Sequence, residues 1–218
     1  MLQSISDEGI LHQRLCTWKS QEMCIDCNIS GQLMCRYDRG DLFKFLLAFL
    51  PFGASVVVGF IRGGYGIYLL GWLVYWGLFF FIWEARVLCR HCPYWAEERK
   101  VLHCHANYGV LKIWAYDPSP LSKGEKVQLI VGMLIFVGYP FVFLLMGKQY
   151  LLTLVALGAV LLSGYNLRKN ACPRCINFSC PLNTVPKPIV DSYLRHNAIM
   201  REAWEARGYQ LGPYGDFA

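Results

Sequence analysis

Ten cysteines carry the clearest chemistry in this 218-residue chain, and nine of them fall into three groups of three. Each group begins with a Cys-x-x-Cys pair and adds a third cysteine five to twelve residues later. Such a pair lets two thiolates reach one ion from a single turn, and a third thiolate leaves one position of a tetrahedral site to fill. The predicted metal ligands are Cys24, Cys27, Cys35, Cys89, Cys92, Cys104, Cys172, Cys175, Cys180 and the histidine after the central group, His105.

Three histidines lie within or directly beside the central group, between Cys89 and His105. His103 and His105 flank one cysteine and cannot easily serve the same ion, and His105 is kept as the predicted ligand. His91 lies inside a Cys-x-x-Cys pair and is expected to point away from the ion. The fourth position of each site stays open to a histidine, to Cys16 or to a cysteine of another group, although Cys16 stands outside the groups and is expected to be a spare thiol.

The pattern favours zinc and leaves an iron-sulfur cluster as the alternative. Interleaved histidines and small polar segments that need a metal to fold are typical of structural zinc sites. Thiolate richness and the pairs Cys92-Pro93 and Cys180-Pro181 are typical of iron-sulfur ligation. In these features the chain loosely resembles polytopic iron-sulfur membrane proteins that pass electrons to periplasmic reductases. It lacks their compact C-x-x-C-x-x-C-x-x-x-C-P run, so the resemblance assigns no residue roles.

The elements that must position these cysteines are apolar helices. The composition is 55% hydrophobic and only 17% charged, which is unusual for a soluble globule. Two almost uncharged blocks, residues 42–83 and 127–167, are each long enough for two spans of ~20 residues. The predicted fold is an all-α polytopic membrane protein with four transmembrane helices in two hairpins. Its segments are 1–40 (Cys-rich N-terminal segment), 41–83 (hairpin 1), 84–126 (Cys/His-rich loop), 127–167 (hairpin 2) and 168–218 (Cys-rich tail).

Several local signals mark the ends of the expected helices. Asp41 is a candidate N-cap for the first span, and Ser122 with Glu125 has the spacing of a capping box before the third. In the tail, residues 190–207 are expected to form one amphipathic helix that packs on the cysteine-rich region, with Gly208 as its stop. The hairpins also resemble each other, because each returning helix leads to a Cys-x-x-Cys pair, which suggests an internal repeat.

The distribution of basic residues predicts the orientation in the membrane. Of the 21 lysines and arginines, only Arg62 and Lys148 fall in the two outer turns. The positive-inside rule then puts both termini and the middle loop in the cytoplasm, at the inner (cytoplasmic) membrane. All ten cysteines share that face, where thiols are kept reduced, so metal ligation is favoured over disulfides.

The sequence also excludes several kinds of function. The net charge of +6 is explained by the cytoplasmic loops, and no nucleic-acid-binding motif accompanies it. No histidine and no mid-span charge lies in the apolar blocks, which argues against intramembrane haem and ion-coupled transport. Hydrolase, phosphate-loop and dinucleotide signatures are absent, so an enzymatic activity of its own is not expected.

These observations predict a membrane anchor or assembly subunit. Its cysteine-rich segments would fold together around zinc and dock a protein partner at the cytosolic face. Two alternatives stay open, namely an iron-sulfur subunit that links a soluble redox enzyme to a membrane partner, and a thiol-based metal-handling protein.

Overall fold

The structure, a computed structural model, describes residues 27–97 and 99–213. In this part of the chain the regular elements are helical, and the only β-structure is one isolated bridge between Val101 and Leu111. Four segments are long and apolar enough to cross a membrane, with 24, 26, 24 and 25 residues. A helix of 24 residues is about 36 Å long, which exceeds the ~30 Å hydrocarbon core of a bilayer. The prediction of four such helices is confirmed. Their α-helical parts are α2 (Arg39–Arg62), α3 (Gly66–Leu78), α5 (Lys123–Met146) and α6 (Tyr150–Asn166).

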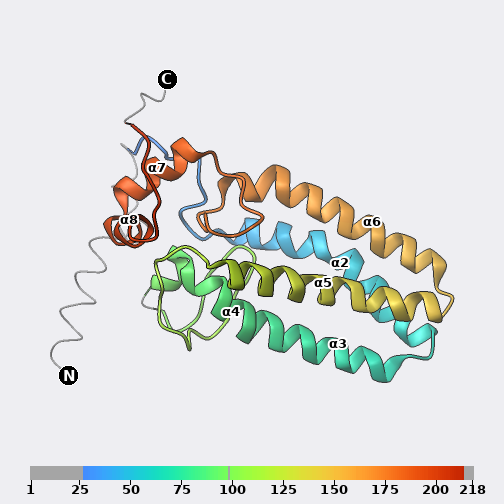
Figure 1. Cartoon of the computed structure of the whole chain (residues 1–218). Coiled ribbons are helices and arrows are strands. Elements are labelled where there is room, and N and C mark those ends of the chain that lie inside the picture. The colour runs from blue at the N-terminus through green and yellow to red at the C-terminus, as the bar shows by residue number, and fades with distance from the viewer. Residues whose placement is uncertain (1–26, 98, 214–218) are drawn as a thin grey trace.

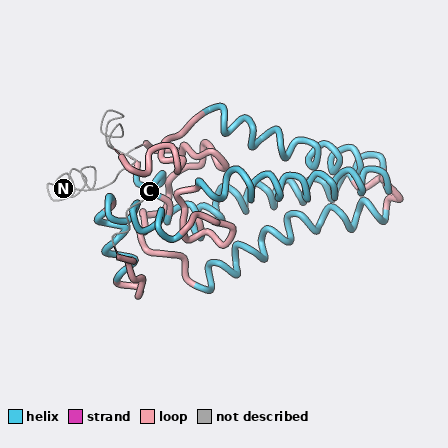
Figure 2. Tube along the Cα trace, turned by 90° about the horizontal axis from the view of Figure 1, so that it is seen from above, coloured by secondary structure: helices cyan, strands magenta, loops and turns pink. Residues whose placement is uncertain are grey.

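The four long helices run side by side, and everything else in the described chain gathers at one end of them. In Figure 1 the turns between α2 and α3 and between α5 and α6 lie together at the opposite end. Figure 2 shows the loops and short helices clustered at the first end. We call this cluster the head and define it as residues 27–38, 84–97, 99–122 and 167–213. The described cysteines all belong to it.

Polar caps fix where the first and third long helices begin. The Ser122 hydroxyl accepts a hydrogen bond from the backbone N–H of Glu125, and the Glu125 carboxylate accepts one from the backbone N–H of Ser122, so the predicted capping box is confirmed. The expected cap at Asp41 is wrong, because Asp38 caps α2 and accepts from the backbone N–H of Asp41 at 3.0 Å. Asp41 instead lies in the first turn, where a negative charge also stabilises a helix, and it pairs with Lys44 at 3.1 Å.

The bundle core is largely aromatic, and α2 packs along α6. The buried residues of this core are Phe52, Val56, Phe60, Leu69, Trp72, Leu144, Ala156 and Ala159. A Cβ on Gly59 of α2 would overlap the side chain of Leu144, so glycine permits the close approach there. The Ser163 hydroxyl of α6 donates to the Ala48 carbonyl of α2 at 2.6 Å. Small residues thus let helix backbones come close, as is typical of membrane bundles.

Pro140 lies inside α5 and cannot donate to the carbonyl of Phe136. The indole N–H of Trp72 donates to this carbonyl at 2.9 Å from the neighbouring helix α3. One turn earlier, the Tyr75 hydroxyl donates to the Gly132 carbonyl at 3.0 Å. Aromatic donors on α3 therefore satisfy backbone acceptors on α5 that water cannot reach, which makes a proline acceptable inside a span.

Large apolar side chains cover the outside of the bundle. Leu151 is 74% exposed, and Leu162 and Ile67 are each 71% exposed. An apolar surface of this extent on a soluble monomer would cause aggregation, whereas lipid tails accommodate it. The bilayer is thus the natural surrounding of the four helices.

The head has its own hydrophobic core, to which all three cysteine-bearing segments contribute. Leu33 comes from the segment before α2, Trp95 and Val110 from the loop between the hairpins, and Ile176 and Tyr193 from the tail. The backbone N–H of Met34 donates to the Arg174 carbonyl at 2.7 Å, although the two residues are far apart in the sequence. The three segments therefore fold as one unit.

Two short helices end the described chain and pack into the head core. They are α7 (Lys187–His196) and α8 (Ala198–Glu205), with Asn197 between them, so the single helix expected over residues 190–207 is wrong. Val190, Tyr193, Leu194, Met200 and Trp204 are buried in the core, which confirms that this part of the tail packs on the cysteine-rich region. Gly208 follows with φ 85°, and the N–H of Tyr209 closes the turn onto the Trp204 carbonyl at 3.0 Å.

Candidate metal centre

Each returning helix leads into a Cys-x-x-Cys turn, and the two turns have the same backbone conformation. The first cysteine starts a 3₁₀ turn, at Cys89–His91 and at Cys172–Arg174. The second cysteine is extended in both, with φ −89° and ψ 139° at Cys92 and φ −78° and ψ 128° at Cys175. We call Cys89–Cys92 the first turn and Cys172–Cys175 the second turn.

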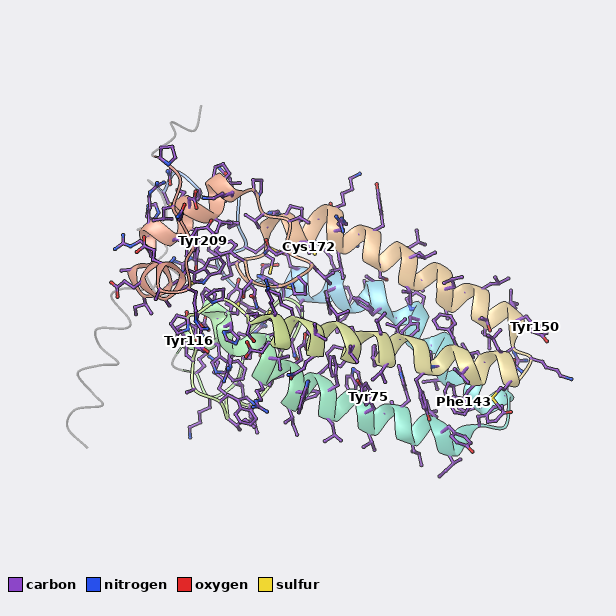
Figure 3. All side chains as sticks on the ribbon, in the orientation of Figure 1. Tyr75, Tyr116, Phe143, Tyr150, Cys172 and Tyr209 are labelled. Carbon is purple, nitrogen blue, oxygen red and sulfur yellow. The ribbon has the colours of Figure 1, made fainter. Side chains whose placement is uncertain are left out.

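A π-helical turn precedes each Cys-x-x-Cys turn. It spans Phe79–Trp83 after α3 and Leu167–Ala171 after α6. In the first hairpin a further short helix, α4 (Glu84–Val87), separates the π turn from Cys89, whereas in the second hairpin the π turn leads directly into Cys172. π turns change the direction in which the following side chains point and are frequent at functional sites. In Figure 3, Cys172 lies at the head end of α6, and Tyr150 marks the opposite end of that helix.

Hydrogen bonds join the two turns and the N-terminal segment. The side-chain amide of Asn177, two residues after the second turn, donates to the Leu88 carbonyl at 3.2 Å, just before the first turn. The Tyr94 hydroxyl, two residues after the first turn, donates to the Met34 carbonyl at 2.7 Å. Cysteine-bearing segments that are distant in the sequence are therefore neighbours in the head.

The thiols of the central and tail groups lie within electrostatic range of one another. Burial raises the pKa of Cys92 well above its ordinary value, and the charges of Cys104, Cys175 and Cys180 raise it further. Burial likewise raises the pKa of Cys175 to about 12, with contributions from Cys104, Cys180 and Cys172. Because burial, and after it the neighbouring charges, disfavour the thiolates, these thiols favour the protonated form in the absence of a cation. A metal ion supplies that charge and displaces the protons.

The Tyr94 hydroxyl lies within electrostatic range of cysteines from all three groups. Burial raises the pKa of its hydroxyl, and the charges of Cys92, Cys104, Cys175 and Cys35 add to the shift. Cys35 of the N-terminal group therefore lies in the same neighbourhood, and both Cys35 and Cys27 pack against the head core. Cys24 and Cys16 lie outside the described residues.

The three central histidines have different partners. His105 is buried, and its Nε2 shares a hydrogen bond of 2.8 Å with the Tyr94 hydroxyl. Burial lowers the pKa of His105, and the charge of Asp41 opposes this effect. His103 lies 3.3 Å from an Arg99 guanidinium nitrogen and against the rings of Tyr37 and Tyr108.

His91 is turned toward the start of α5. Its Nδ1 lies 2.8 Å from the Ser119 carbonyl and its Nε2 lies 3.3 Å from Glu125 Oε1. The neighbouring Arg90 donates to the same Glu125 oxygen at 3.0 Å and lies 3.5 Å from Asp117. The two central residues of the first turn thus bind α5 and the loop before it.

The donors are present but are not already arranged as a closed site. Among the described residues, no three His, Cys, Asp or Glu side chains form a group that could hold a metal ion. All eight described cysteines are free thiols. The cysteines are of the ligand type that a thiophilic ion prefers, but the described donors are not placed as a metal site.

Glu84 and Asn107 lie near Cys89 but belong to no sequence motif. The Asn107 amide donates to Glu84 Oε2 at 3.0 Å and lies 4.0 Å from Cys89 Sγ. Glu84 follows an apolar run directly, at the place where a charge ordinarily marks the end of a span. Its side chain is nevertheless buried.

Comparisons with protein-family models, with curated proteins and with solved structures find no match. Function must therefore be inferred from the chain's own residues.

Proposed function

We propose that this chain is an integral membrane protein whose head binds zinc through cysteines of the central and tail groups, and that it serves as an anchor or assembly subunit for a protein partner. The observation that carries the proposal is the pairing of the two Cys-x-x-Cys turns. They share one backbone conformation, Asn177 joins their flanks, and the charges of Cys104, Cys175 and Cys180 act on Cys92.

Zinc suits this arrangement for chemical and structural reasons. Thiolates are its preferred structural ligands, and it needs only four of them in a tetrahedral site. The central and tail groups supply six. The ammonium group of Lys112 donates to the carbonyls of Tyr94 and Glu97 at 3.1 and 2.7 Å, and it interacts with the Cys92 charge, so it favours the thiolate.

The proposed place is the cytoplasmic face of the inner membrane. The head carries most of the basic residues, while the opposite end has Arg62 and Lys148 in its turns. The positive-inside rule favours a cytoplasmic head, where reduced thiols are available to a metal.

An iron-sulfur electron-transfer subunit is the second candidate, and the convergence on Tyr94 favours it. Thiols from all three groups act on this residue, and together the groups hold more thiols than one zinc ion uses. Cys92-Pro93 and Cys180-Pro181 also match the Cys-Pro pairs that accompany clusters.

Metal analysis of anaerobically purified protein decides between the two. Colourless protein with bound zinc supports the first proposal, and broad visible absorption with iron and sulfide supports the second. Cys92→Ser should abolish metal binding in either case. Cys16→Ser is the matched control, because this cysteine stands outside the three groups, and it should keep the wild-type metal content. Wild-type protein that binds neither zinc nor iron would contradict both proposals.

A further inference from the structure

Arg86 is a cation at the level where the second span leaves the bilayer. It belongs to α4, which Figure 1 shows at the head end of α3, and its side chain is exposed. The span begins at Gly66, about 20 residues before Arg86, which corresponds to about 30 Å of helix and to the thickness of the hydrocarbon core. Arg86 therefore lies at the level of the lipid headgroups on the head side.

Two indole rings hold the Arg86 guanidinium in place. Its Cζ lies 5.8 Å from the ring centroid of Trp83, on the same span, and 5.6 Å from that of Trp114, in the loop between the hairpins. The attraction acts between the positive charge and the ring faces, so it fixes the position of the charge. The rings offer no oxygen acceptor to the five N–H donors of the guanidinium.

No anion of the protein neutralises this cation within residues 27–97 and 99–213, where no ion pair and no side-chain hydrogen bond engages Arg86. The neighbouring Arg90 differs, because its guanidinium lies 3.0 Å from Glu125 and 3.5 Å from Asp117. Arg86 thus combines a fixed position with donors that an external anion can use.

Large apolar side chains are exposed next to the two indoles in the chain. Ile82 and Trp83 are each 42% exposed, and Ile113, which precedes Trp114, is 60% exposed. Water is a poor surrounding for such side chains, whereas the upper part of a lipid leaflet accepts both them and a cation. The combination of a positive charge with exposed apolar groups suits a lipid better than a free anion.

The second hairpin has a corresponding but simpler arrangement. Lys169 stands three positions before the first cysteine of the second turn, as Arg86 does before the first turn, and its ammonium lies 5.7 Å from the ring centroid of Tyr165. Both hairpins therefore place a cation over an aromatic ring at the same level. A lysine is a point charge without the planar set of donors that matches a phosphate, so Arg86 is expected to bind the more tightly.

We propose that Arg86 binds the phosphate of an anionic phospholipid in the leaflet on the head side, and that Trp83 and Trp114 hold the guanidinium at headgroup depth. The phosphate accepts hydrogen bonds from the guanidinium N–H groups, and such charge-assisted pairs are frequently bidentate. The acyl chains lie against the exposed apolar side chains. The site rests on the membrane placement of the four helices and is independent of the proposed zinc.

Native mass spectrometry of the full-length protein in detergent tests this site. The protein is titrated with phosphatidylglycerol, which carries a net negative charge, and with phosphatidylcholine of the same acyl chains, which is neutral overall. Wild type should bind the first phosphatidylglycerol more tightly than the first phosphatidylcholine. Arg86→Gln should weaken that first binding about tenfold. Lys123→Gln removes one exposed charge at the head end of α5 and, as the matched control, should weaken it less than about twofold.

Equal binding of the two lipids by wild type would overturn the proposal, and this result does not depend on the folding of any variant. An equal loss in Arg86→Gln and Lys123→Gln would also overturn it, because a general attraction between a positive head and negative lipids would then explain the binding. Inorganic phosphate at the concentration of the lipid should leave the lipid bound, and displacement would indicate a site for soluble anions. Preference for phosphatidylglycerol in protein without zinc would contradict the proposed zinc site and leave the lipid site standing.

Discussion

The first and second Cys-x-x-Cys turns share a backbone conformation but lie in different surroundings. Cys89 and Cys92 are each only 6% exposed and belong to the head core, whereas Cys172 and Cys175 are half-buried. The two residues inside the first turn bind Glu125, while Arg174 inside the second turn is exposed. The local chain geometry is thus set by the Cys-x-x-Cys pattern, and the packing around it decides how much each turn contributes to stability.

Serine substitution at the second cysteine of each turn should separate these contributions most strongly. Cys92→Ser removes a proposed ligand, so it should abolish metal binding. It also places a hydroxyl in the core, so it should lower the amount of folded protein. Cys175→Ser should release metal while the level of protein stays close to wild type. Metal content and detergent-extracted yield measure the two effects. Equal yields for the two variants would mean that the difference in burial has no energetic consequence.

Removal of the charge at Glu125 should destabilise the packing of the first turn against α5 and leave the second turn unaffected. Glu125→Gln can still complete the capping box with Ser122, but it loses the charge that faces Arg90 and His91. We expect the free energy of unfolding of the head to fall by about 1.5 to 3 kcal/mol. Pulse proteolysis in urea measures it. Lys123→Ala, an exposed position of the same helix turn, is the control and should have little effect.

Loss of the amide that joins the two turns should have a smaller effect. Asn177→Ala removes the bond to the Leu88 carbonyl and leaves that acceptor without this partner. A cost of about 1 to 3 kcal/mol is expected, at the lower end because the acceptor residue Leu88 is only half-buried. Metal affinity should fall as well, since the spacing of the turns is no longer fixed. If stability falls and metal affinity does not, the bond serves packing only.

Low pH should cause the smallest loss of stability, and this loss should arise in the tail that supports the second turn. Burial by itself would raise the pKa of Asp191, but bonds from Lys187, Tyr209 and the Gly212 N–H hold it below its usual value. The folded head favours the charged carboxylate, so this stabilisation is present above pH about 4 and is lost as the pH falls through the lower folded-state value. Asp191→Asn should flatten the pH dependence of the head's stability below about pH 4. An unchanged slope would contradict this role for Asp191.

The four long helices could be predicted from the sequence because the signal extends over whole blocks of apolar residues. The capping box at Ser122 could also be predicted, since its two partners lie three residues apart. The N-cap of α2 could not, because Asp38 and Asp41 are equally good residues for a cap and for a first turn, and only the course of the preceding chain selects between them.

The pairing of the two turns and the environment of Glu84 depend on contacts between distant segments. Cysteine spacing predicts a turn, but the bond from Asn177 to Leu88 joins residues that no local pattern relates. The π turn at Phe79–Trp83 has no sequence signature. From the sequence alone, Glu84 is therefore expected to be an ordinary charge at the end of a span. The break between α7 and α8 at Asn197 was missed for a similar reason, since both halves contribute to one apolar face.

The contact between the two glycine turns at the far end of the bundle affects the head from a distance. Gly63 and Gly147 face each other there, and a Cβ on Gly147 would come within 3.0 Å of the Gly63 Cα. The hairpins therefore touch at the far end as well as along α2 and α6, where the Ser163 hydroxyl donates to the Ala48 carbonyl at 2.6 Å. The distance between the first and second Cys-x-x-Cys turns is thus set by the packing of the whole bundle and not by the head alone.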